Sequence, residues 1–79
     1  MTMTNADIDR ERSRALGGIF VACRRIEKAR KDLLVNTNSD QIAILHRIIK
    51  INKGTIEICI GNIALANDLL ERRLKRLER

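Results

Sequence analysis

Proline is absent from this sequence of 79 residues, and so are tryptophan and tyrosine. Proline kinks or ends a helix because it has no backbone N–H and its ring clashes with the preceding turn. Its absence, together with only four glycines, favours long uninterrupted helices and few turns. Phe20 is the single aromatic residue, so any hydrophobic core must be built mainly from aliphatic side chains.

Cysteine and histidine are also scarce, with Cys23, Cys59 and His46 as the full set. Three such residues are too few for a zinc site or a disulfide framework. The sequence also carries no glycine-rich phosphate loop, no Ser/His/Asp set and no paired carboxylates of the kind used in acid–base catalysis. We therefore predict that the protein is not an enzyme. We expect no catalytic, cofactor-binding or metal-binding residue and no small-molecule substrate.

No apolar run reaches the ~20 residues that a helix needs to cross a bilayer. The first residues are mostly polar or charged and do not resemble a signal peptide. Two thiols without an export signal fit a reducing compartment. We expect a cytoplasmic protein with no transmembrane segment.

A seven-residue apolar repeat organises the second half of the chain. Its members are Ile42, Ile49, Ile56, Ile63, Leu70 and Leu77. A repeat of this period keeps one side of a helix facing a partner helix. It predicts a helix over about residues 39–77, capped at its start by Asn38.

The first half of the chain repeats with the same period but alternates small and large residues. One row holds Ile8, Ala15, Ala22 and Ala29, and the next holds Ile19, Ile26 and Leu33. These rows predict a helix over about residues 5–35, capped at Thr4, with alanines that allow a close neighbour. We expect Gly17 and Gly18 to lie within this helix, because the repeat keeps its register across them.

The short polar segment 36–38 separates the two predicted helices, and so short a connection makes them antiparallel neighbours. A lone domain of this size buries only about 60% of its unfolded surface and usually needs a staple or a partner chain. We therefore predict one all-α domain over residues 1–79. It is a coiled-coil-like hairpin that oligomerises into a larger bundle, such as a four-helix bundle.

A second apolar row on the later helix motivates a partner. It holds Ile44, Ile51, Ile58 and Leu65. A hairpin needs only one seam, so a second seam indicates a further helix, from another copy or from a different protein. A widely wound first helix is the alternative cover for this row. The predicted partner-binding residues are Ile44, Ile48, Ile51, Ile58, Leu65, Leu69, Leu74 and Leu77.

Asn52 falls among apolar positions of the main seam. A buried asparagine often sets register or oligomeric state at a cost in stability. The alternative is that Asn52 lies at the edge of the seam in water.

Basic residues gather toward the connection, within a chain of net charge +6. The candidate patch for a nucleic acid or an acidic partner consists of Arg24, Arg25, Lys28, Lys31, Arg47, Lys50 and Lys53. Such a cluster suits a phosphate backbone, but with Phe20 as the single aromatic residue, stacking on single-stranded bases is disfavoured. A solvated basic face, or a dock for an acidic protein, is the preferred interpretation.

The hairpin plan with its alanine row resembles the Rop family of plasmid-copy-control proteins, which form dimeric four-helix bundles and bind paired RNA loops. It also resembles the hairpin co-chaperones of type III secretion systems, which shield an aggregation-prone helical subunit. Both resemblances rest on length and helical pattern.

These observations favour a non-enzymatic interaction module, a small helical subunit, chaperone or adaptor that self-associates or buries a partner helix. A homodimer or a helical heteromeric partner is expected. The competing hypothesis is a Rop-like protein that binds the backbone of duplex RNA or DNA. A third hypothesis is membrane-surface attachment through the basic, leucine-bearing residues 71–79.

Overall fold

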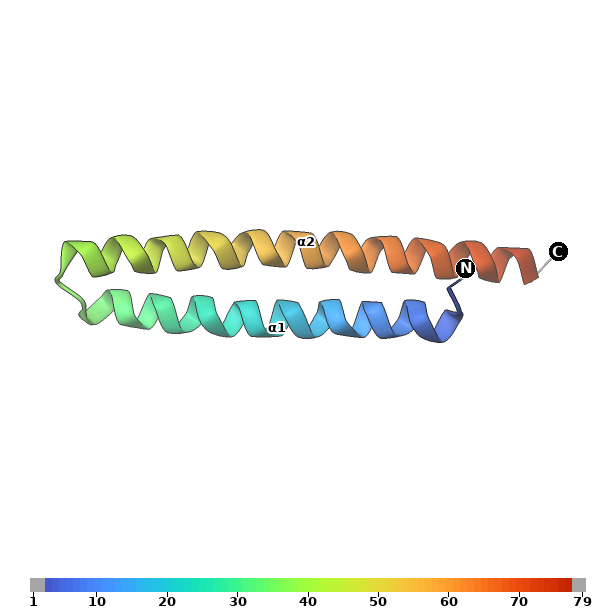
Figure 1. The fold of residues 1–79 in the computed structure, drawn as a ribbon, viewed down its shortest axis with the longest axis horizontal. Helices are drawn as coiled ribbons and strands as arrows, with labels where there is room; N and C mark the ends of the chain where they lie inside the picture. The colour runs from blue at the N-terminus through green and yellow to red at the C-terminus, as the bar shows by residue number, and fades with distance from the viewer. Residues whose placement is uncertain (1–2, 78–79) are drawn as a thin grey trace.

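The computed structural model describes residues 3–77, which form two long helices joined by a short connection (Figure 1). Helix α1 covers Asn5–Val35 and helix α2 covers Ser39–Leu77. The helices lie side by side and antiparallel in a rod of 63 × 22 × 14 Å, with the start of α1 and the end of α2 at the same end of the rod. The predicted helical hairpin is confirmed, with the helix bounds that the sequence indicates.

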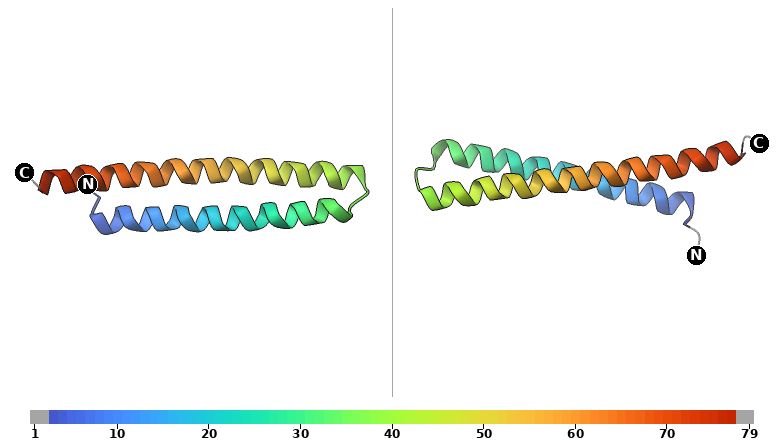
Figure 2. Two further views of the ribbon diagram at one scale, coloured as in Figure 1. Left: turned by 180° about the vertical axis from the view of Figure 1, so that it is seen from behind. Right: turned by 90° about the horizontal axis from the view of Figure 1, so that it is seen from above.

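The helices cross at a shallow angle rather than running strictly parallel, and α2 extends beyond the start of α1 (Figure 2). The overhang begins near Arg73, whose guanidinium donates hydrogen bonds to the Asn5 side chain at 2.8 Å and to the Met3 carbonyl. Residues 78 and 79 of the basic C-terminal segment lie outside the described residues.

Side-chain caps explain where both helices begin. The Thr4 hydroxyl accepts a hydrogen bond from the Asp7 backbone N–H at 3.1 Å, and the Thr4 N–H donates to the Asp7 carboxylate at 3.1 Å. The Asn38 side-chain oxygen accepts from the backbone N–H groups of Asp40 and Gln41 at 2.9 and 3.2 Å. These bonds satisfy N–H groups that have no partner in the first turn of a helix.

Small residues occupy the contact between the helices. The buried apolar residues are Ile8, Ala15, Ala22, Ile26, Ala29, Leu45 and Ala66. The predicted alanine row of α1 is therefore confirmed as the centre of the contact. On α2, the row from Ile42 to Leu70 is only half-buried, and its last member, Leu77, is exposed. The neighbouring row that contains Leu45 and Ala66 lies deeper.

Asn52 belongs to this deeper row and is buried, with 6% of its surface exposed. Its side-chain amide donates to the Ile48 carbonyl of the same helix at 2.8 Å. This hydrogen bond offsets part of the cost of burying the amide without using a group from α1. Of the two interpretations left open by the sequence, the structure shows the buried one.

The Gly17–Gly18 pair lies within an unbroken α1, as the sequence predicts. The two glycines differ in their surroundings. A Cβ atom added at Gly18 would lie 2.9 Å from the Cys59 Sγ atom, whereas one added at Gly17 would meet nothing within 4 Å. Gly18 therefore serves the close contact between the helices.

This difference predicts unequal effects on stability for two neighbouring substitutions. Gly17→Ala should raise the free energy of unfolding by up to about 1 kcal/mol, because alanine is the better helix former and the position is open. Gly18→Ala should gain less or lose stability, because its Cβ meets Cys59. The measurement is urea unfolding followed by circular dichroism at one protein concentration. Adding Cys59→Ala to Gly18→Ala should restore the gain, and equal effects of the two alanines would contradict the assigned contact.

The cap of α1 also makes a prediction about pH. Hydrogen bonds from Thr4 lower the pKa of Asp7 below its ordinary value of 3.8. The larger effect comes from the Thr4 backbone N–H, and the smaller one comes from the Thr4 side chain. Because the folded pKa is the lower one, this stabilisation is complete above the unfolded pKa and is lost as pH falls through the folded pKa. Carboxyl NMR titration should show the low pKa, and Thr4→Ala should raise it toward 3.8. Thr37→Ala, in the connection, should not move it.

Candidate partner-binding surface

The second apolar row of α2 is uncovered in the hairpin. The exposed fractions of Ile44, Ile51, Ile58 and Leu65 are 47, 60, 67 and 62%. Ile48 and Leu69, on the adjacent row, are half-buried. Helix α1 therefore does not cover this row. The exposed aliphatic side chains of the row form a candidate binding surface.

Together these residues form a regular seam, called the second seam below. It consists of Ile44, Ile48, Ile51, Thr55, Ile58, Asn62, Leu65 and Leu69. Their spacing alternates between four and three residues, which is the spacing of residues that interlock with a neighbouring helix in a coiled coil. The seam extends over about 38 Å at about 1.5 Å per residue. Six of its eight members are aliphatic.

The polar members of the second seam are compatible with contact to a partner. The Thr55 hydroxyl donates to the Ile51 carbonyl of its own helix at 3.2 Å, so it needs no external partner. Asn62 lies beside α1, in a groove whose lining includes Glu11, Arg14, Ala15, Asn62, Leu65 and Leu69. One wall of this groove is therefore the second seam, and the other carries charged side chains of α1.

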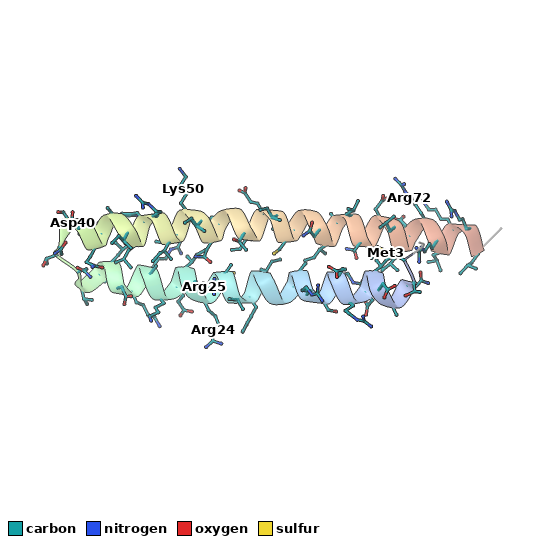
Figure 3. The ribbon with its side chains drawn as sticks, viewed as in Figure 1. Met3, Arg24, Arg25, Asp40, Lys50 and Arg72 are labelled. Atoms are coloured by element: carbon teal, nitrogen blue, oxygen red, sulfur yellow. The ribbon has the colours of Figure 1, made fainter. Side chains whose placement is uncertain are left out.

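Leu74 and Leu77 are exposed but do not continue the second seam. They lie on the overhang of α2, with exposed fractions of 57 and 80%. The next two positions at seam spacing after Leu69 are Arg72 and Arg76, and Arg72 points away from α1 (Figure 3). The eight residues predicted as one partner-binding set thus divide into six on the second seam and two on the overhang.

A smaller apolar patch lies on the other side of the hairpin. Its members, Leu16, Phe20 and Ile60, are more than half exposed. Glu11 lies four positions before Ala15, and Leu16 lies one position after it. On a helix, this spacing places the Glu11 and Leu16 side chains on opposite sides of the alanine row. The Arg24 guanidinium lies over the Phe20 ring, 5.8 Å from its centroid. The site prediction omitted this patch, because its members do not form a long repeat.

The predicted basic residues are spread around the hairpin. Arg24, Arg25 and Lys28 line a shallow hollow on α1, and Lys50 and Lys53 line another on α2. Arg24 and Lys50 point from opposite edges of the rod (Figure 3). Lys31 pairs with Glu27 at 3.3 Å on its own helix, and Arg47 is exposed. The structure thus brings Arg24, Arg25 and Lys28 together on α1. It also places Lys31 and Lys53 along one hollow between the helices. Lys50 points from the edge opposite to Arg24.

Comparison with known proteins adds no relative: no family model, curated protein or solved structure matches this chain. Within residues 3–77, neither helix combines the length and apolarity required to span a membrane. The same described residues contain no group of three or more His, Cys, Asp or Glu side chains arranged to hold a metal ion.

Proposed function

We propose that this protein is a non-enzymatic interaction module, a small helical subunit, chaperone or adaptor that buries a helix against the second seam. The observation that carries the proposal is the exposure of Ile44, Ile51, Ile58 and Leu65 at coiled-coil spacing on a helix that already packs against α1. Contiguous apolar surface of this kind marks interaction sites on small proteins.

The small core of the hairpin supports the same proposal. Four of its seven buried apolar residues are alanines, whereas thirteen large hydrophobic side chains of the described residues are exposed. The ion pairs identified among residues 3–77 each join two side chains of one helix, and exposed pairs of this kind stabilise by about 1 kcal/mol at most. A covered second seam would supply the apolar burial that the hairpin lacks.

Binding to duplex RNA or DNA remains the competing hypothesis. A duplex that contacts one side of the rod would meet Arg24, Arg25 and Lys28 without reaching Lys50 on the opposite edge. This separation favours the helix-binding module over the nucleic-acid binder. The localisation in the cytoplasm stays an expectation from the sequence.

The central test introduces lysine into the second seam. Ile51→Lys with Ile58→Lys should weaken association by more than about a hundredfold, because each large aliphatic side chain lost from a buried seam costs about 2 kcal/mol or more. Sedimentation equilibrium of the full chain at micromolar concentration measures the effect.

The matched control places the same two lysines on the smaller patch, as Leu16→Lys with Ile60→Lys. These positions have similar exposure, 54 and 56%, and the charge added is the same. Association should persist in this control. A stable, well-folded monomer of the natural sequence, or equal losses in both variants, would overturn the proposed function.

A further inference from the structure

We infer that the helix that covers the second seam is α2 of a second copy of this chain, packed antiparallel about a two-fold axis between Thr55 and Ile58. This inference rests on the proposed function, because it names the partner of the same seam. Three features of α2 support it: the seam residues, the charged residues beside the seam and the residues at the ends of the seam. Each is complementary to the same feature of a second, antiparallel α2.

The apolar positions match in one antiparallel register. Ile44 then packs against Leu69 of the partner subunit, and Ile48 against Leu65 of the partner subunit. Nearer the axis, Ile51 meets Asn62 of the partner subunit and Thr55 meets Ile58 of the partner subunit. Every layer contains at least one aliphatic side chain. Some seam residues are followed by the next seam residue four positions later, and the others three positions later. In every layer of this register, a residue of the first kind packs against one of the second kind, as in an antiparallel coiled coil.

The flanking row of α2 matches in the same register. This row holds Asp40, Arg47, Gly54, Gly61, Asp68 and Lys75. The antiparallel pairing places Arg47 beside Asp68 of the partner subunit and Lys75 beside Asp40 of the partner subunit. Two opposite charges therefore meet at each of these places, in both copies. Gly54 and Gly61 flank the axis, and a Cβ atom added at either position would meet nothing within 4 Å among the described residues.

The ends of the second seam favour the antiparallel over the parallel arrangement. Beyond Leu69 the seam positions are Arg72 and Arg76, and before Ile44 the seam position is Gln41. A parallel in-register pair would bring each arginine against its own copy, and like charges in contact are destabilising. The antiparallel pair sets Arg72 against Gln41 of the partner subunit instead. A self-complementary surface of this kind is what a two-fold dimer requires.

Distance measurements between spin labels test the direction of the helices. The labels are attached to Lys75→Cys or to Glu57→Cys in the full chain, with Cys23→Ser and Cys59→Ala removing the natural thiols. In the antiparallel dimer, the two labels at position 75 should lie about 55 Å apart at about 1.5 Å of helix rise per residue. The two labels at position 57 should lie within about 25 Å, because helices pack at 8–10 Å and position 57 lies near the axis. Short distances at both positions would overturn the inference.

A charge exchange tests the register. Residues 47 and 68 are separated by about 31 Å within one helix, so they interact only between copies. Arg47→Asp alone and Asp68→Arg alone should each raise the dimer dissociation constant about three- to tenfold, because two exposed pairs between the copies are lost per dimer. Asp68→Arg also removes the ion pair of Asp68 with Arg72 in its own helix, which the double variant does not restore. The double variant should bring the dissociation constant back toward that of the natural sequence. If the double variant instead raises the dissociation constant by the product of the two single-variant factors, this register is wrong.

The two proposals fail in different ways. Seam-dependent association with parallel helices, another register or more than two copies would overturn the antiparallel dimer and leave the helix-binding function standing. A folded monomer, or association that Ile51→Lys with Ile58→Lys leaves unchanged, would overturn both. A dimer with long distances at position 75, short distances at position 57 and restoration by the charge exchange supports both.

Discussion

The close contact of two helices along a row of alanines is the constraint on which the rest of this structure depends. Ala15, Ala22 and Ala29 leave little room between α1 and α2, so only three large side chains, Ile8, Ile26 and Leu45, are buried in the contact. The position of greatest burial on α2 accordingly goes to Asn52 and Ala66, and at one point a glycine of α1 faces a cysteine of α2. Most of the isoleucines and leucines of α2 lie beside this contact, half-buried or exposed.

This displacement has an energetic consequence. Burial of a large aliphatic side chain stabilises a fold by about 1.5–3 kcal/mol, and alanine contributes far less. A hairpin whose contact consists mostly of small residues therefore gains shape complementarity but little hydrophobic stabilisation. Its interhelical hydrogen bonds, such as the one from Arg12 to Asn67 at 2.9 Å, lie at the surface, where water competes with them. The proposed association along the second seam would add the apolar burial that this small core lacks.

Helix α2 uses one rule twice. Alternating steps of four and three residues place one set of its side chains against α1 and a second set, from Ile44 to Leu69, on a neighbouring flank. Helix α2 therefore carries an apolar seam beyond the one that contacts α1, whereas α1 has one regular seam and a surface rich in charge. The basic side chains around the rod then keep the remaining surface hydrated, and their separation onto different edges weakens the argument for one nucleic-acid face.

The sequence by itself determined the two helices, their ends, the alanine contact and the second apolar row, because periodicity and capping residues act locally. The tertiary structure alone decided that Asn52 is buried, that Gly18 rather than Gly17 touches α2 and that Arg24 and Lys50 diverge. A seven-residue repeat selects a side of α2 but leaves the rotation of that helix about its own axis undefined by some tens of degrees. Packing against the alanines of α1 fixes that rotation and therefore determines which side chains of α2 are exposed.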